Sequence, residues 1–362
     1  MIVLYGAGKD LEGILEKSNK LSEEIVIVDS DPNKRAEGIS GYKVMEPSII
    51  HKMTPNDFVF ITSKKYYSEI YDSVKKINQN VAIYGINAVK WVLYKKDKVL
   101  EYINAEDNYE VKIDIANWLK SALSNEVGYW VKRVKEQREK GDKRFTEREF
   151  SYPYDTEIVF KQEDIILDVG CGPLPKFGNR INGKEIRYIP VDPLAHQYLD
   201  ILKKQDIILP VEPKFAIMEM LTCFYQENTI DYVIVNNALD HCIDILRAFI
   251  ECFRVVKIGG YFLMEHLEAE GLHNEYEGLH QWNLTCTETD LICFNENGVK
   301  INLSTLFQPY ADIEVKRIQD GYRDMIITRI KKKGNLPSAL LAKYDDKTLI
   351  GELIDKLFEK LL

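Results

Sequence analysis

The sequence contains one pattern twice: a short apolar run rich in β-branched residues, a turn with two glycines, a stretch of helical periodicity, and a second apolar run that ends in aspartate. The two copies start near residues 2 and 165, and their final aspartates are Asp29 and Asp192. Continuous apolar strands that alternate with helices are typical of parallel sheets covered on both faces. The pattern therefore predicts an α/β protein with two doubly wound, Rossmann-like domains.

The remaining segments divide the 362 residues further, and this length suits two domains. The second α/β domain is expected to end in an antiparallel hairpin formed by residues 313–318 and 325–330. We expect a nucleotide- or nucleotide-sugar-binding module over 1–100, a helical connector or lid over 101–160, the second α/β domain over 161–332, and an amphipathic C-terminal helix over 333–362.

Periodicity also locates individual elements. Within the first module we expect further strands at 58–62 and 81–84, with a helix at 66–77 between them. Apolar residues at helical spacing in the connector predict a buried side, which consists of Trp118, Leu119, Val127, Trp130 and Val131.

Charge and composition exclude several function classes. The chain has 48 Lys and Arg against 57 Asp and Glu, a formal net charge of -9, so no global attraction to nucleic acid or anionic lipid is expected. No stretch approaches the roughly 18 apolar residues of a membrane span, and no export leader is visible. Six scattered cysteines predict reduced thiols. We expect a cytoplasmic protein with a small-molecule substrate.

The second glycine turn carries the clearest site. Asp168 ends a strand and is followed by Val169 and Gly170-Cys171-Gly172, where glycines permit turn conformations and a close approach of the backbone to a ligand. Asp192, at the tip of the next strand, suits the two hydroxyls of a ribose. A phosphate-binding loop fits less well, because neither a Lys-Ser/Thr pair nor a third glycine follows.

The residues around this turn resemble the class I S-adenosylmethionine-dependent methyltransferases. Residues 167–172 look like motif I of that family, and Asp192 falls at its ribose-binding acid. The resemblance covers about residues 160–330 and implies a seven-stranded sheet that ends in an antiparallel hairpin. Further matches, in the family's order, are residues 219–221 in the loop beside the adenine, residues 230–241 in the fourth strand with its active-site loop, and residues 254–260 before the fifth strand.

This resemblance implies S-adenosylmethionine as the cofactor and assigns roles by position. Gly170 and Gly172 would let the loop pass under the methionine part, and Asp168 would hold the loop or the amino group. Ile217 stands where the family often has an acid for the adenine amine, so a backbone carbonyl or Glu219 must serve. The implied cofactor-binding residues are Asp168, Gly170, Cys171, Gly172, Asp192, Met218, Glu219, Met220 and Asn236, together with Trp130 from the connector.

Methyl transfer to a hydroxyl requires a base, for which a histidine is suited. His241 follows Asp240 in the loop after the fourth strand, and we consider both residues catalytic candidates together with His280. His266 is a further histidine near the same mouth, and for each of these histidines a structural role stays open. Tyr276, Gln281, Trp282 and Asn283 surround His280 and suit a sugar ring, although Trp282 would also serve as a core anchor. The histidines and cysteines lack metal-ligand spacing, so no metal is expected.

Two functions follow from these patterns. The first is O-methylation of a sugar or sugar-phosphate group in bacterial surface polysaccharide biosynthesis, which rests on the ordered motifs and on the loop with Tyr276, His280 and Trp282. The resemblance adds that a Glu followed by Phe/Tyr-Trp, here Glu126, Tyr129 and Trp130, recurs in relatives encoded with surface-sugar genes. The alternative places nucleotide-sugar binding or NAD-dependent oxidoreductase chemistry in the first module. There Asp29 would bind a ribose, although Leu11 replaces the third fingerprint glycine. A purely structural or dimerising module, and a homo-oligomer, stay open.

Overall fold

The computed structural model describes residues 1–18, 21, 24–111, 114–344 and 360 of the chain. It divides into two compact units. The first consists of Met1–Asn104 with Gln319–Asp324, and the second of Ala105–Ile318 with Met325–Leu362.

The first unit contains a five-stranded sheet in the order β3-β2-β1-β4-β5, and every strand pair is parallel. The order reverses between β1 and β4, as in doubly wound sheets. The predicted strands are confirmed within one residue at either end, whereas β3 was not predicted because it has only two residues. The elements are β1 Ile2–Tyr5, α1 Lys9–Leu15, β2 Ile25–Val28, α2 Pro32–Glu37, β3 Val44–Met45, β4 Phe58–Ile61, α3 Tyr67–Ile77, β5 Ala82–Tyr84, α4 Ile86–Lys90 and α5 Lys96–Asn104.

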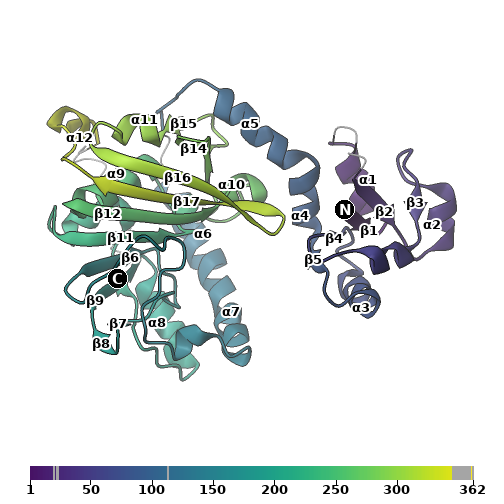
Figure 1. Cartoon of the computed structure of the whole chain (residues 1–362), viewed down its shortest axis with the longest axis horizontal. Helices are drawn as coiled ribbons and strands as arrows, with labels where there is room; N and C mark the ends of the chain where they lie inside the picture. The colour runs from purple at the N-terminus through teal and green to yellow at the C-terminus, as the bar shows by residue number, and fades with distance from the viewer. Residues whose placement is uncertain (19–20, 22–23, 112–113, 345–359, 361–362) are drawn as a thin grey trace. The chain divides into compact units, whose positions relative to one another are not determined.

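The second unit contains a seven-stranded sheet in the order β10-β9-β6-β11-β12-β17-β16, which Figure 1 shows as one twisted layer. β17 lies antiparallel to β12, so the predicted seven-stranded sheet with a terminal antiparallel pair is confirmed. The strands of this sheet are β6 Ile165–Val169, β9 Arg187–Asp192, β10 Lys214–Phe215, β11 Ile230–Asn236, β12 Val256–Leu267, β16 Ala311–Asp320 and β17 Arg323–Lys332.

Helices and two small sheets surround this layer. The longest buried helix, α9 Ile245–Val255, packs into the main core, because nearly every one of its side chains is inaccessible to solvent. The other elements are α6 Ile115–Ser121, α7 Val127–Glu139, β7 Arg180–Ile181, β8 Lys184–Glu185, α8 Ala195–Lys204, α10 Glu270–His273, β13 Trp282–Cys286, β14 Leu291–Asn295, β15 Lys300–Asn302, α11 Leu303–Phe307 and α12 Ser338–Tyr344.

The helix predicted after the second glycine turn does not exist. Residues 170–186 are all described, and they form a loop and the hairpin β7–β8 in place of a helix. Pro173 and Pro175 lack the amide protons that a helix needs. Gly178 lies so close to the backbone of Arg148 that an added Cβ would be 2.2 Å from its carbonyl carbon. An aromatic cluster covers this face of the sheet, and it includes Phe150, Tyr152, Phe160, Phe177 and Tyr188.

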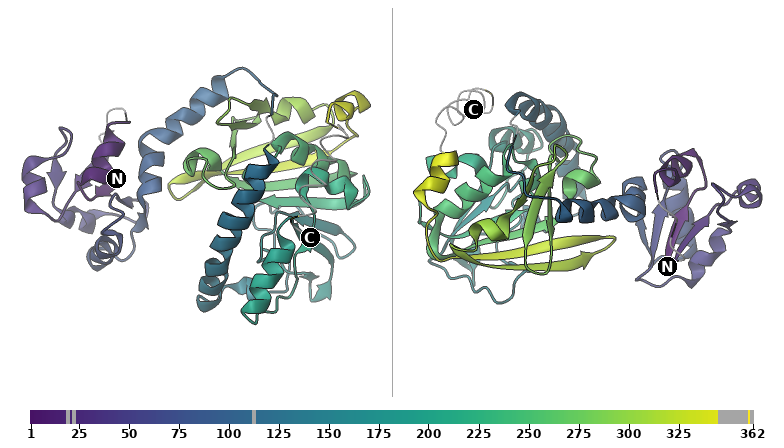
Figure 2. Two further views of the ribbon diagram at one scale, coloured as in Figure 1. Left: turned by 180° about the vertical axis from the view of Figure 1, so that it is seen from behind. Right: turned by 90° about the horizontal axis from the view of Figure 1, so that it is seen from above.

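Only part of the predicted connector over 101–160 is helical, because residues 146–160 form no helix. α6 and α7 flank a π-helical turn, Ala122–Glu126, and α7 lies beside α8 (Figure 2). Trp118, Leu119, Val127 and Trp130 pack against the core cluster around α8. Val131 is 48 % exposed, so its predicted place on the buried side is wrong. Of the predicted C-terminal helix, residues 345–359 and 361–362 lie outside the described residues.

A buried lysine fixes the end of α9 against β17. The Lys332 amine donates hydrogen bonds to the carbonyl oxygens of Phe253 (2.9 Å), Arg254 (3.1 Å) and Val256 (2.9 Å). These carbonyls have no partner within the helix, so the amine satisfies the C-terminal end of α9.

We expect Lys332→Met to lower the free energy of unfolding by about 1.5–3 kcal/mol, because it removes hydrogen bonds from a charged donor to buried acceptors. Urea denaturation followed by circular dichroism measures the change. Lys333→Met is the matched control, since the Lys333 side chain is half exposed and pairs with the exposed Asp312. Equal midpoints for the two variants would contradict this role of Lys332.

Candidate active site

The glycine loop after β6 forms the floor of the site. Gly170 and Gly172 have φ angles of +72° and +65°, a region that favours glycine. A Cβ on Gly170 would lie 2.4 Å from the Cβ of Ala238, whereas one on Gly172 would lie 3.6 Å from the ring of Trp130. The backbone amides of Gly170 and Cys171 both donate to the carbonyl of Val191 on β9. The loop is therefore held tightly at the carboxyl ends of β6 and β9.

Asp192 ties this loop to the next element. One carboxylate oxygen accepts from the amide of Gly172 (3.0 Å), and the other accepts from the amide of Leu194 (2.8 Å). Burial raises the pKa of Asp192 to about 7, although these hydrogen bonds oppose the shift. Each carboxylate oxygen has a second lone pair. Asp192 can therefore accept further hydrogen bonds from ligand hydroxyls while it holds the loop.

Asp168 and Asn236 lie at the carboxyl ends of β6 and β11. Asp168 is buried and accepts a 2.5 Å hydrogen bond from the Tyr188 hydroxyl. Burial raises the pKa of Asp168 to about 6. Both amide atoms of Asn236 are inaccessible to solvent, and neither forms a hydrogen bond of standard geometry within the described part of the chain. Such orphaned groups are costly unless a ligand or water satisfies them.

The predicted adenine-lining residues have different surroundings. The Glu219 carboxylate accepts from the amides of Ile243 (2.6 Å) and Asp244 (3.3 Å), so its side chain serves the start of α9. Burial raises the pKa of Glu219 to about 7. Met218 lies beside the floor of the site, with its methyl carbon 3.6 Å from the position of a Cβ on Gly170. Met220 is buried in the core cluster around α8.

Trp130 and Tyr129, the two aromatic residues of the connector near the site, also differ in their surroundings. Trp130 covers Gly172 and donates a 2.7 Å hydrogen bond from its indole nitrogen to Glu126. Tyr129 is 54 % exposed. Contact of these connector and loop residues with a cofactor stays a prediction, but the structure brings Trp130, Gly172 and Asp192 together.

A second group of residues surrounds the buried carboxylate of Asp240. His280 Nδ1 lies 2.6 Å from Asp240 Oδ2, and His266 Nε2 lies 3.1 Å from Asp240 Oδ1. His241 Nε2 lies 3.4 Å from the same Oδ2 and 3.1 Å from His280 Nδ1. The three catalytic candidates of the sequence thus meet, and His266 joins them from the end of β12.

The protonation of this cluster follows from its partners. Both nitrogens of His266 face acceptors, Asp240 Oδ1 and the carbonyl of Leu267 (2.8 Å), so this ring carries both protons. Burial lowers the pKa of His266 and of His280, but Asp240 more than offsets it, and both values are raised. Burial also raises the pKa of Asp240, yet the histidines hold it below its usual range. Protonated His266 therefore balances the negative charge of the buried Asp240 carboxylate.

Ligand atoms of Asp240, His241 and His280 all lie within 4.8 Å of one another, which is also compatible with a cation site. Sequence spacing did not show this cluster, because His280 is 39 residues from His241. Hydrogen bonding accounts for the observed distances, since 2.6 Å is normal for a charge-assisted bond.

The loop that carries His280 is anchored through its other residues. The Gln281 amide donates to the backbone carbonyl of Asp240, and the Gln281 side chain donates to the carbonyls of Tyr276 and Gly278. Trp282 is 2 % exposed and donates its indole proton to the carbonyl of Cys242. Trp282 is therefore a core anchor and does not offer a face to a sugar.

In the first unit the carboxylate of Asp29 is already bonded. Its oxygens accept from the amides of Ala7 (2.7 Å) and Asp31 (2.8 Å), and from the Lys34 amine (3.2 Å). Leu11, at the position of the missing third glycine, is fully buried. These contacts close the glycine turn onto β2, and binding of a nucleotide or NAD there stays a prediction.

A comparison with known protein families agrees with the fold described for the second unit. Residues 167–264 match a family described as a methyltransferase domain, and this segment contains the glycine loop, Asp192 and Asp240. The protein is an S-adenosylmethionine-dependent methyltransferase. Residues 1–86 match a family described as C2185-like, N-terminal. Among curated proteins, none matches the methyltransferase at a significant level.

Many solved structures are similar to this chain, and three of them serve as examples. The PH0226 protein of Pyrococcus horikoshii is 17 % identical over 48 % of this chain and 84 % of its own, with a TM-score of 0.30. An S-adenosylmethionine-dependent methyltransferase of Methanosarcina mazei is 16 % identical over 51 % and 99 %, with a TM-score of 0.30. Phosphoethanolamine N-methyltransferase 2 of Haemonchus contortus is 13 % identical over 91 % and 94 %, with a TM-score of 0.35.

The residues present fit the cofactor. Glycines at 170 and 172 leave room against the backbone, Asp192 retains acceptor capacity for hydroxyls, and the Asn236 amide lacks partners. Bound S-adenosylmethionine supplies a methyl group on a cationic sulfur. Among residues 1–18, 24–111 and 114–344, no helix is long and apolar enough to cross a membrane.

We expect Gly170→Ala to weaken binding of S-adenosylhomocysteine by at least tenfold, because the new Cβ would overlap Ala238 and the positive φ disfavours alanine. Isothermal titration calorimetry measures the change. Gly183→Ala is the matched control: its φ is +74°, yet no described atom lies within 4 Å of the added Cβ. If both variants bind like the parent, the glycine loop does not contact the cofactor.

Proposed function

We propose that the protein transfers the methyl group to a hydroxyl of a sugar or sugar-phosphate acceptor in bacterial surface polysaccharide biosynthesis, with His280 as the general base. The observation that carries the proposal is the 2.6 Å hydrogen bond between His280 Nδ1 and the buried carboxylate of Asp240. A hydroxyl becomes a good nucleophile only as its proton leaves, and an oriented imidazole near neutral pKa accepts that proton efficiently.

The geometry specifies which nitrogen acts. Because Nδ1 of His280 donates its proton to Asp240, Nε2 of the neutral ring carries the lone pair that would accept a proton from the acceptor. His266 is buried and doubly bonded, whereas the side chains of His280 and His241 are 30 % and 24 % exposed. His241 lies against His280 and would support its orientation. This combination favours an oxygen acceptor over an amine, which needs less help with its proton.

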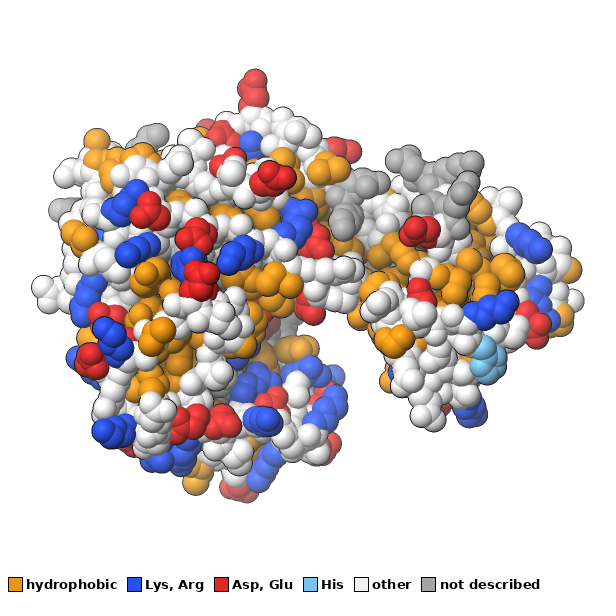
Figure 3. Space-filling view, viewed as in Figure 1, with side chains coloured by type: hydrophobic (Ala, Val, Ile, Leu, Met, Phe, Trp, Pro, Cys, Tyr) orange, Lys and Arg blue, Asp and Glu red, His pale blue; other side chains and the backbone are white. Residues whose placement is uncertain are grey.

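The acceptor class rests on the sequence and on the surface. Figure 3 shows basic and acidic side chains intermixed on the visible face of the second unit, which suits a small molecule better than a polyanion. The sugar and the pathway come from the resemblance carried by Glu126 and Trp130. For the oxidoreductase alternative, Asp29 has less free acceptor capacity than Asp192, because one of its carboxylate oxygens already accepts from both Ala7 and Lys34.

The acceptor is found by incubating the enzyme with methyl-labelled S-adenosylmethionine and a panel of sugars, sugar phosphates and nucleotide sugars, with products identified by mass spectrometry.

With an acceptor that is methylated on oxygen, we expect His280→Gln to lower kcat by about 10²–10⁴-fold while affinity for S-adenosylhomocysteine is unchanged. His51→Gln, an exposed position in the first unit, is the control. Full turnover of His280→Gln would remove it as the base.

The pH profile gives an independent test. The base acts when neutral, so kcat/KM should rise with pH through a pKa above the ordinary histidine value, because Asp240 raises the pKa of His280. Asp240→Asn removes the negative charge, and we expect its profile to shift toward lower pH with a lower plateau. A profile that keeps its position in Asp240→Asn would show that this carboxylate does not control the base.

A further inference from the structure

A second polar cluster lies near the glycine loop and contains Lys176, Glu265, Tyr152 and Tyr154. The Lys176 amine pairs with the Glu265 carboxylate at 2.7 Å and lies 4.5 Å from the centre of the Tyr154 ring. The Lys176 side chain is 40 % exposed, whereas that of Glu265 is 8 % exposed. A partly solvated cation is thus paired with a buried anion.

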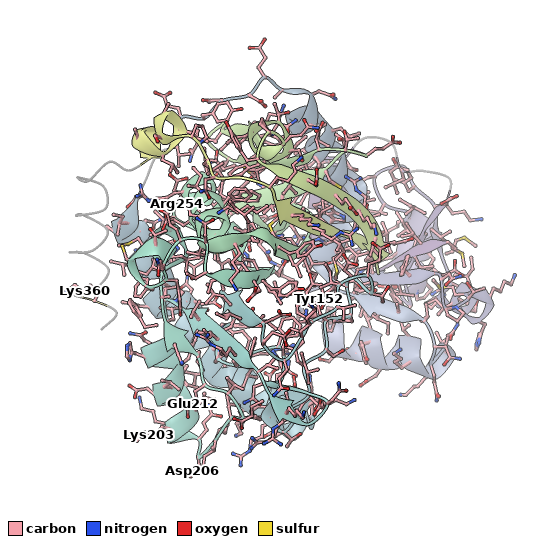
Figure 4. All side chains as sticks on the ribbon, turned by 60° about the vertical axis from the view of Figure 1, so that its left-hand side comes forward. Tyr152, Lys203, Asp206, Glu212, Arg254 and Lys360 are labelled. Carbon is pink, nitrogen blue, oxygen red and sulfur yellow. The ribbon has the colours of Figure 1, made fainter. Side chains whose placement is uncertain are left out.

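Unsatisfied polar atoms accompany this ion pair. Tyr152 is 9 % exposed, and its hydroxyl has no hydrogen-bond partner within the described chain. Tyr152 comes from the segment before β6 and is labelled in Figure 4. Burial raises the pKa of the Tyr152 phenol, and the charges of Glu265, Asp155 and Asp168 raise it further. The two amide atoms of Asn236 form no hydrogen bond of standard geometry within the described residues, although the amide is close enough to Asp168 to lower the pKa of that carboxyl.

Strand register places these groups at one edge of the sheet. Asn236 on β11 is paired with Glu265 on β12, and Asp168 on β6 is paired with Ile234, two residues before Asn236. Side chains two apart on a strand share a face. Asp168, Asn236 and Glu265 therefore line one face at the carboxyl ends of three neighbouring strands, directly below the loop that carries Lys176.

We propose that Lys176, Glu265 and Tyr152 bind a zwitterionic α-amino-acid group, which is the methionyl end of the cofactor. The inference rests on S-adenosylmethionine as cofactor and adds residues that read its amino-acid end. The ligand carboxylate receives hydrogen bonds from the Lys176 amine and the Tyr152 hydroxyl. The ligand ammonium donates to Glu265. The two orphaned atoms of Asn236, one donor and one acceptor, match the same pair of charges.

The absence of a helix after the glycine loop makes this arrangement possible. The described loop 173–178, with its two prolines, carries Lys176 over β12, where the pair with Glu265 forms. The pair of Lys176 with Glu265 leaves the Tyr152 hydroxyl and the Asn236 amide without hydrogen bonds of standard geometry within the described residues. A ligand with both charges satisfies all of them together.

The test compares two ligands that differ only in the amino-acid end. S-adenosylhomocysteine has this group, and 5′-methylthioadenosine lacks it. We expect Lys176→Met to weaken binding of S-adenosylhomocysteine by about 10- to 100-fold and to leave binding of methylthioadenosine unchanged. Tyr152→Phe removes only the hydroxyl and should show the same selectivity with a smaller loss. Lys184→Met, exposed on the hairpin β7–β8, is the control.

The possible outcomes distinguish a failure of this inference from a failure of the cofactor assignment. The proposal is overturned if Lys176→Met loses affinity equally for both ligands while Tyr152→Phe binds both like the parent protein. The ion pair would then have a structural role only. A Lys176→Met variant that binds S-adenosylhomocysteine normally but has a raised KM for the acceptor would also overturn it, because the cluster would then read the acceptor. If the parent protein binds neither ligand, the cofactor itself is wrong.

Discussion

The buried carboxylate of Asp240 determines how the acceptor side of the site is assembled. An ionised group with no exposed surface must be paired, and here histidines from three parts of the chain provide the pairing. His266 at the end of β12 carries the compensating charge. In the proposed reaction, His280 releases and accepts a proton without leaving Asp240 unpaired. The position of the β13 loop follows from this requirement, because Gln281 also bonds to the backbone of Asp240.

Local patterns predicted the glycine loop and the strands that hold it, whereas contact of these residues with the cofactor stays a prediction. The longer parallel strands of both units follow from continuous apolar runs, and the loop at Gly170 and Gly172 follows from glycines directly after such a run. Asp192 was predictable for the same reason, since parallel strands bring their carboxyl ends to one edge. The seven-stranded order came from a family resemblance, and composition or periodicity alone would not have provided it.

Long-range contacts explain what the sequence did not show. His280 meets His241 across 39 residues, and Lys176 meets Glu265 across 89, so neither pair leaves a spacing signal. The helix predicted after Gly172 is absent because aromatic side chains cover that face of the sheet instead. Trp282 and Glu219 have suitable chemistry for ligand contact, but they are used by Cys242 and by the amides before α9. A polar side chain near a site is available to a ligand only when it is not already hydrogen-bonded to a backbone group.

The alternation of β12 links the two halves of the site. Glu265 and His266 are consecutive residues, so their side chains point to opposite faces of the sheet. Glu265 faces Lys176 and His266 faces Asp240. If the amino-acid end of the cofactor binds at the first face and the base lies on the second, the reacting methyl group must be at the edge where β11 and β12 end. A register shift of one residue in β12 would exchange the two charges, which makes the pairing of β12 with β11 and β17 a condition for catalysis as well as for folding.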